Sequence, residues 1–399
     1  EQAKVSLLDE TKANFTNQSY LPYRGYYYDR IMMHTYMALN FLQQANVEAA
    51  RVSLNRSYQS QREAVDEFAA EIEAANEVAT QESRAAQRSP KSDKYYDVNR
   101  ARENSEFQRQ MQANYGYLDE MKAYADYVNP FSVFIDGLIN LTNDLEYNDL
   151  ERARKSLQRV ASMAPGNDYL IKDVQAAERR LSGDPLRETT YVIFETGMAP
   201  SRDQVKINIP LFIVTRDVPY VGVAFPQLRF NNNFVPALDV TADGMPYRTQ
   251  MICDMDSIVA TEFDQRLPLI IVKTLISAGT KAAAQYGLQE AAKSNDAAYW
   301  SVLVAGSIYQ AAMNNADLRT WVTLPKQFQY CRFPTPTSGQ IQLRAGGITQ
   351  TVKLLPGRVN LVYVKSNSLY SPLIIQQNTL APLGPVKDVP AANYDTAQL

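Results

Sequence analysis

Side chains that usually carry out catalysis are few in this chain. Its 399 residues include one histidine, His34, and two cysteines, Cys253 and Cys331. A Ser–His–Asp or Cys–His site needs a histidine close to a nucleophile, but His34 lies in a helical stretch, in a different predicted domain from both cysteines. We therefore interpret His34 as a packed helix residue. One histidine and two separated cysteines also fall short of the three or four ligands of a zinc site.

Two aspartates, Asp254 and Asp256, lie two residues apart in the stretch CDMDS. Such a pair can hold a metal that bridges nucleotide phosphates, but here it precedes a helical run. We predict that Asp256 or Ser257 is the N-cap of that helix and accepts a hydrogen bond from a free backbone amide. The sequence has no G-x-x-x-x-G-K loop, G-x-G-x-x-G turn or G-x-S-x-G elbow. It therefore predicts no catalytic residue, no metal and no cofactor.

The two cysteines allow two interpretations. Cys253 and Cys331 each lie in or at the end of a strand-like run, without a CxxC motif or a nearby histidine. They are either two buried free thiols or a disulfide, which would require an oxidising compartment. Such a bridge would close a loop of roughly 80 residues and stabilise the fold by about 4 kcal/mol through chain entropy.

Tyrosine is unusually frequent, with 25 Tyr against 14 Phe. Tyrosine suits partly wet surfaces, where the ring is buried and the hydroxyl meets water or a partner. The triplet near residue 27 either contacts a partner or covers the open end of a helical region. The predicted partner-contact residues are Tyr23, Tyr26, Tyr27, Tyr28 and Trp300.

Composition limits the class of protein. The net charge is only -3, so no basic surplus exists for nucleic acid. Hydrophobic residues are 45% and charged residues 21%, which suits a folded chain, and the length favours two or more domains. The longest apolar stretches, near 267–276 and 300–313, fall short of the roughly 20 residues that span a bilayer. Because the first residue is Glu1, we expect a processed N-terminus, whose membrane attachment would be a lipid outside this chain.

Helical periodicity runs from about residue 25 to 183. One unit, about 131–165, has Gly137, Leu138 and Leu141 on its first helix and the apolar stripe Ala153, Leu157, Val160 on its second. An earlier unit has a first helix with Met33, Tyr36, Met37 and Leu39, and a second with Ala50, Leu54 and Tyr58. In both second helices a small residue is followed four residues later by Leu, as in tetratricopeptide (TPR) repeats. A helical hairpin, about 60–128, is predicted between the units.

Strand patterns begin near residue 185. DQVKINIPLF alternates, with Val205, Ile207 and Ile209 on one face. Residues 339–366 read as a meander, with Ile341, Leu343, Val352 and Leu354 on one buried face. A helical hairpin rich in small residues, about 255–320, interrupts the strands, and 381–399 is a Pro/Ala-rich extended tail.

The predicted fold class is therefore α+β and multidomain. Residues 1–184 form a TPR-like α-solenoid with an inserted helical hairpin. Residues 185–380 form an antiparallel β-sandwich-like domain that carries the second helical hairpin.

Several stretches together resemble one family, among them ARVSLNRSYQSQREAVDEFAAEI, ERARKSLQRVASMAPGN, GMAPSRDQVKINIPLF and ADLRTWVTLPKQFQYCRF. The resemblance, over most of 25–366, is to bacterial envelope proteins of the outer-membrane lipoprotein type, with TPR-like helices followed by a β-rich domain. In many genomes that family sits beside a lipoprotein resembling activators of penicillin-binding proteins. The resemblance implies a periplasmic or outer-membrane location and supplies no catalytic residues.

Three functional hypotheses follow. The first is a non-enzymatic scaffold of a bacterial cell-envelope assembly, contacting other envelope proteins and copies of itself through the helices and the β-domain. The alternative is a periplasmic regulatory lipoprotein that binds and activates a peptidoglycan synthesis enzyme. The third is an enzyme acting on carbohydrate, which would need a pocket with two carboxylates roughly 5–10 Å apart.

Overall fold

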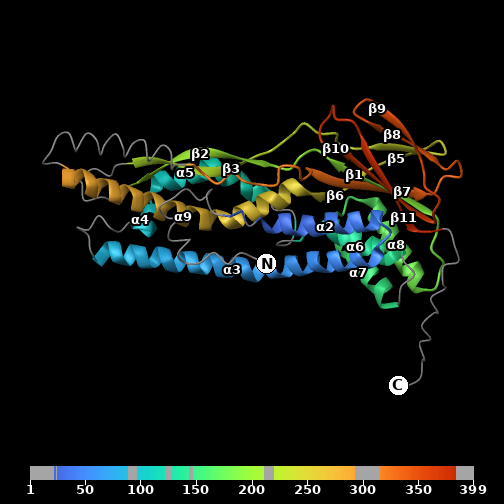
Figure 1. Ribbon diagram of the computed structural model, residues 1–399, viewed down its shortest axis with the longest axis horizontal. Helices are drawn as coiled ribbons and strands as arrows, with labels where there is room; N and C mark the ends of the chain where they lie inside the picture. Colours follow the sequence, from blue (N-terminus) through green and yellow to red (C-terminus); the bar gives the residue numbers. More distant parts are fainter. Residues whose placement is uncertain are drawn as a thin grey trace, which may run out of the picture.

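A computed structural model of the chain describes residues 22–23, 25–88, 97–121, 124, 128–142, 147–210, 220–292 and 315–382. The described part is elongated and of mixed α+β class (Figure 1). Several of the helices and the larger sheets gather at one end. Two long helices and a β-ribbon extend together toward the other end.

The N-terminal helices form one long hairpin. Helix α2 (Tyr27–Gln43) packs along the first part of α3 (Val47–Arg88). Helix α3 has 42 residues, so the second helix of the earlier unit and the first part of the predicted insertion at 60–128 are one continuous element. Ala50 and Leu54 are buried as expected, but Tyr58 is exposed on α3 and Met33 on α2. The inner face of α2 is formed instead by Tyr28, Ile31, Met32, Thr35, Ala38 and Leu39.

The second predicted pair of helices packs closely. Helices α6 (Pro130–Thr142) and α7 (Tyr147–Met163) lie side by side, and α8 (Asp168–Leu181) packs on α7. Ala153, Leu157 and Val160 are fully buried, as their spacing predicts. A Cβ atom on Gly137 would lie 2.9 Å from Leu157 Cγ. The absence of a side chain at residue 137 therefore sets how closely α6 and α7 approach.

The predicted helical insertion at 60–128 differs from a simple hairpin. The chain returns from α3 through α4 (Val98–Arg102), α5 (Ser105–Tyr115) and the 3₁₀ helix η2 (Gly116–Glu120). Helix α5 packs on the ribbon of β2 (Ser201–Pro210) and β3 (Tyr220–Arg229). The Gln110 side chain accepts the Asn208 amide at 2.9 Å, and Phe107 contacts the Phe225 ring. The return is divided into short helices, each with its own N-cap: Asp97 accepts the Arg100 amide at the start of α4, and Asn104 accepts the Phe107 amide at the start of α5.

A five-stranded mixed sheet lies against α2, α6 and α8 (Figure 1). It contains β1 (Thr189–Thr196), β6 (Gln250–Asp254), β7 (Gln327–Pro334), β10 (Val359–Ser366) and β11 (Ile374–Ala381), in the order β11-β10-β1-β7-β6. Strands β1 and β10 are parallel and the other pairs antiparallel. The prediction of a purely antiparallel sheet is therefore wrong at this pair. Every residue of β1 is buried, as expected for a strand covered on both faces.

A four-stranded antiparallel sheet contains β4 (Asp239–Ala242), β5 (Met245–Arg248), β8 (Gln340–Ala345) and β9 (Ile348–Lys353), in the order β5-β4-β8-β9. Ile341, Leu343, Val352 and Leu354 are buried, as predicted. The predicted meander ends at β9, however, because β10 pairs with β1 in the other sheet. In the ribbon, Ile207 is fully buried while Lys206 is exposed, which confirms the predicted alternation in β2.

Helix α9 (Met255–Ala292) extends in the same direction as α3 (Figure 1). It confirms the first helix of the predicted 255–320 hairpin. Residues 293–314, including Trp300, and the tail from 383 onward lie outside the described residues. Among the helices that the structure describes, none is both long enough and apolar enough to cross a membrane.

One hydrophobic core joins the helical region to the sheets, with members on both sides of the predicted boundary at 184. The Phe131 ring of α6 stacks on Phe328 of β7, with centroids 3.8 Å apart. Met32 of α2 and Val192 of β1 belong to the same core. We therefore expect the two regions to unfold together.

Candidate functional site

The predicted tyrosine patch lies at the start of α2, where α2, α3, α9 and β2 meet. The Glu262 carboxylate of α9 accepts the backbone N–H groups of Tyr27 and Tyr28 at 2.9 and 3.1 Å, satisfying donors at the N-terminus of α2. Both tyrosines are buried, and Tyr26 stacks on Tyr28. The rings of Tyr26, Tyr27 and Tyr28 contact the chain itself, and Tyr27 and Tyr28, each 2% exposed, are too deeply buried for the partner contact that was one of the two alternatives. Tyr23 keeps 43% of its surface exposed.

Arginine side chains cover these rings. The Arg266 guanidinium lies 5.1 Å from the Tyr27 ring centroid and 5.4 Å from that of Phe68. It also donates from Nε to Glu262 at 3.0 Å. On the other side, Arg202 of β2 lies 3.9 Å from the Tyr26 centroid. These cation–π contacts join α2, α3, α9 and β2 at one point, so the patch connects elements of the fold.

The two cysteines lie on neighbouring strands but not on the same face. Cys253 of β6 is paired with Phe328 of β7. Because paired residues share a face and side chains alternate along a strand, Cys331, three residues beyond Phe328, lies on the opposite face. Both are buried free thiols, and burial raises the pKa of each thiol well above its usual value. Of the two predicted alternatives, the structure has the free thiols.

The aspartates of the CDMDS stretch have separate structural roles. Asp254 accepts the Asp256 amide at 3.1 Å and the Ser257 hydroxyl at 2.8 Å. Asp254 therefore caps α9, in place of the predicted Asp256 or Ser257. The Asp256 carboxylate instead forms a buried ion pair with Lys326. Burial raises the pKa of Asp256 to about 6, although Lys326 opposes the shift.

His34 lies half-buried on α2, as a packed helix residue would. Burial lowers the pKa of its imidazole, and the nearby Arg56 lowers it further. Within the described ranges, no group of three or more His, Cys, Asp or Glu side chains could hold a metal ion.

A buried cluster around Asp173 was not predicted. Asp173 of α8 accepts the hydroxyls of Tyr191 and Tyr330, both at 2.7 Å, and Nη1 of Arg332 at 2.5 Å. Its side chain is fully buried. Burial raises the pKa of the carboxyl, while Arg332 and both phenols oppose the shift. A sequence signal exists, since Asp173 lies on the apolar face of α8 with Leu170 and Ala177.

A second buried carboxylate, Glu195 of β1, accepts from the Tyr363 hydroxyl and pairs with Lys365, both on β10. The ion pairs of Asp173, Asp256, Glu195 and Glu262 each involve an Arg or Lys of the chain itself. Each of these carboxylates therefore already has a partner within the chain.

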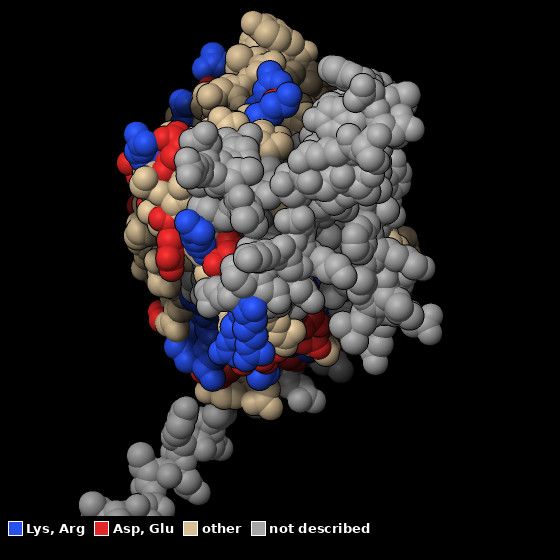
Figure 2. Space-filling view, turned by 90° about the vertical axis from the view of Figure 1, so that its left-hand side faces the viewer, with Lys and Arg blue, Asp and Glu red and all other residues tan. Residues whose placement is uncertain are grey.

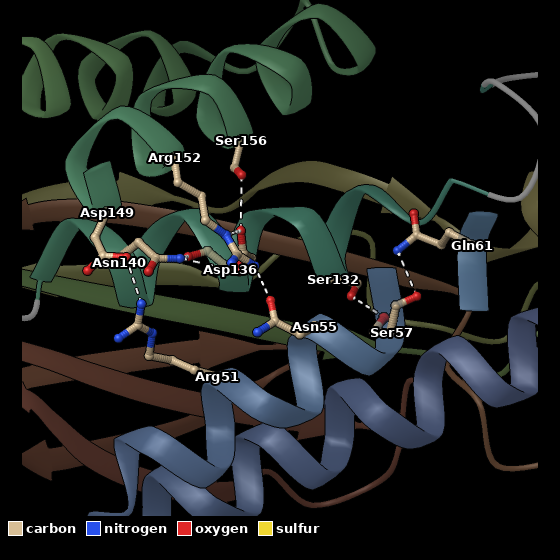
Figure 3. A network of polar contacts seen from close by, with 10 residues as sticks. All are labelled: Arg51, Asn55, Ser57, Gln61, Ser132, Asp136, Asn140, Asp149, Arg152 and Ser156. Carbon is tan, nitrogen blue, oxygen red and sulfur yellow. Dashed lines mark hydrogen bonds and ion pairs between the residues drawn. The ribbon is translucent and has the colours of Figure 1, made fainter. Parts of the chain in front are cut away.

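Figure 3 shows a polar network that joins α3 to α6 and α7. The Arg152 guanidinium of α7 donates to Asp136 of α6 and to Asn55 of α3, the latter at 2.8 Å. Arg51 of α3 pairs with Asp149 of α7 at 2.6 Å. These contacts come from three helices, so they fix the register between the N-terminal hairpin and the second helical pair.

Helix α3 also carries exposed apolar side chains, C-terminal to Asn55 of this network. Tyr58, Val65 and Ile72 are spaced by seven residues, which places them on one face of a helix. Tyr58 is 49% and Val65 48% exposed, whereas Ile72 is half-buried against Phe68. We call Tyr58, Val65 and Ile72 the α3 stripe.

On the face of the molecule shown in Figure 2, the described residues include both basic and acidic side chains. Basic and acidic groups lie beside one another there, in keeping with the nearly neutral net charge.

Comparisons with known proteins gave no relatives. No protein family, curated protein or solved structure matches the chain. The resemblance to bacterial envelope proteins therefore stays a prediction.

Proposed function

We propose that this chain is a non-enzymatic scaffold protein that makes protein–protein contacts, including contacts with copies of itself. The α3 stripe is the observation that carries the proposal. Two large apolar side chains, Tyr58 and Val65, are about half exposed on one face of a 42-residue helix. Apolar residues spaced by seven along a helix are typical of helix–helix contacts.

A second copy of the chain is the partner that we favour. A twofold axis near Val65 would place the α3 stripe of each copy on that of the other, as in an isologous dimer. Arg62 and Asp66 lie one turn apart and are both exposed. In an antiparallel pair, each would face the opposite charge of the second copy. Such pairs favour the correct register and orientation.

The body behind the stripe supports a scaffold role. Helices and sheets share one core, and the buried ion pairs of Asp173, Glu195, Asp256 and Glu262 add cross-links between residues of the chain. We also propose that the helix pairs α2–α3 and α6–α7 are TPR-like. We further propose, from the sequence resemblance alone, that the assembly belongs to the bacterial cell envelope, in the periplasm or at the outer membrane.

Sedimentation velocity over a range of protein concentrations tests the proposal. We expect a species heavier than the monomer that Val65→Glu removes, because a buried charge at the centre of the contact is costly. Val52→Glu is the matched control, since Val52 is also a half-exposed valine of α3 but lies on another face. A monomer at every concentration, or equal effects of the two variants, would contradict self-association through this stripe.

A further inference from the structure

A small cavity opens beside the Asp173 cluster, between the end of α6, the C-terminal half of α8 and the start of β1. Its volume is about 20 Å³ and it is partly open to solvent, so one small group rather than a whole cofactor would fit. Every charged residue among its described lining is an arginine. These are Arg179, Arg180, Arg187 and Arg332.

Three of these arginines have donors to spare. Among the described residues, Arg332 bonds only to Asp173, through Nη1, and its side chain stays 13% exposed. The guanidinium groups of Arg179 and Arg187 have no hydrogen-bond or ionic partner in the same part of the chain. Arg180 donates from Nη1 to the Asp184 carbonyl at 3.3 Å, so we assign it a positioning role. Two acidic residues of the segment between α6 and α7, Asp144 and Glu146, lie outside the described residues.

The rest of the lining strengthens the attraction for an anion. Leu141, Leu186 and Val359 are buried apolar residues of the cavity wall. They reduce the access of water, so a charge inside is screened less than at an open surface. The Asp173 carboxylate accepts from Tyr191, Tyr330 and Arg332, and among the described residues its ion pair is with Arg332.

We propose that this cavity binds an oxyanion group, a phosphate or a carboxylate. The planar guanidinium fork matches both groups, since its parallel N–H donors bind two oxygens at once. Arg332 contacts the anion at the buried end of the cavity, held in place by Asp173. Arg187, which is exposed, and Arg179 contact it from the open side.

Isothermal titration calorimetry on the full chain tests the site at constant ionic strength. Inorganic phosphate and sodium acetate are the probes, and we expect saturable binding of at least one. Arg179→Gln and Arg187→Gln should each weaken that binding by roughly 10-fold or more, as loss of a charge-assisted hydrogen bond implies. Arg159→Gln, an exposed arginine of α7 outside the cavity, is the matched control and should bind as the parent does.

Vesicles separate the two sources of a phosphate group. Flotation with phosphatidylglycerol vesicles, compared with phosphatidylcholine vesicles, identifies a lipid headgroup if the anionic vesicles are bound and Arg187→Gln releases them. Binding of soluble phosphate or acetate without vesicle binding identifies a free anion. Either result supports the site. The proposal is overturned if neither a soluble probe nor the anionic vesicles bind, or if Arg159→Gln weakens binding as much as the cavity variants do.

Discussion

Replacing Asp173 with asparagine tests the buried cluster most sharply. The carboxylate accepts three donors from Tyr191, Tyr330 and Arg332 and is fully buried. An asparagine keeps the shape but removes the charge, and it directs an amide donor toward groups that are themselves donors. Removing one partner of a buried ion pair costs about 3–5 kcal/mol, because the remaining charge stays buried without compensation. We expect Asp173→Asn to lose that much unfolding free energy.

Urea unfolding followed by circular dichroism measures the loss. Glu178→Gln, at an exposed position of the same helix α8, is the control and should change stability by less than about 0.5 kcal/mol. Adding Arg332→Gln to Asp173→Asn removes the uncompensated charge, so the double variant should be more stable than the sum of the single losses predicts. A loss below about 1 kcal/mol in Asp173→Asn would refute our account of this cluster.

Three further predictions follow from buried positions. Because burial raises the pKa of Asp256 from 3.8 to about 6, the folded state holds this proton more tightly than the unfolded state. The contribution of protonated Asp256 to the unfolding free energy is complete below about pH 4 and is lost as pH rises through 6, by about 3 kcal/mol in all. Unfolding curves of Asp256→Asn at pH 4 and 7.5 should lack this pH-dependent contribution. Gly137→Ala should destabilise the fold by about 1–3 kcal/mol despite the better helix propensity of alanine, because the new Cβ lies 2.9 Å from Leu157 Cγ. Adding Leu157→Ala should recover the part of this loss that comes from the clash. A Gly137→Ala variant that is more stable than the parent would contradict the packing. Cys253 and Cys331 should resist alkylation in the folded chain and react in denaturant, because burial keeps both as thiols; non-reducing mass spectrometry that shows a bridge between them would disprove this.

Local patterns predict the parts of the fold that neighbours along the chain determine. The spacing of Ala153, Leu157 and Val160 identifies the buried face of α7, and the alternation around Ile207 identifies that of β2. Gly137 lies on the predicted first helix of this unit, and the structure places it against Leu157 of the second. The continuity of α3 was also predictable, because no proline or glycine interrupts residues 47–88.

Contacts between distant segments were not predictable from those patterns. Strand β10 is parallel to β1 and leaves the expected meander, which depends on the arrangement of the whole sheet. The burial of Tyr27 depends on Glu262, 235 residues away in the sequence. Asp173 gave a usable signal, an acidic residue on an apolar helix face. Its partners Tyr191 and Arg332 lie on two separate strands.

Side-chain footprinting of the α3 stripe tests the central claim most directly. Hydroxyl radicals are applied to the protein at a dilution that leaves monomers and at a concentration that permits association. Tyr58 and Val65 are about half exposed in the single chain. The scaffold account predicts that both become protected at high concentration while Val52 keeps its reactivity. Equal labelling of Tyr58 and Val65 at both concentrations would contradict it.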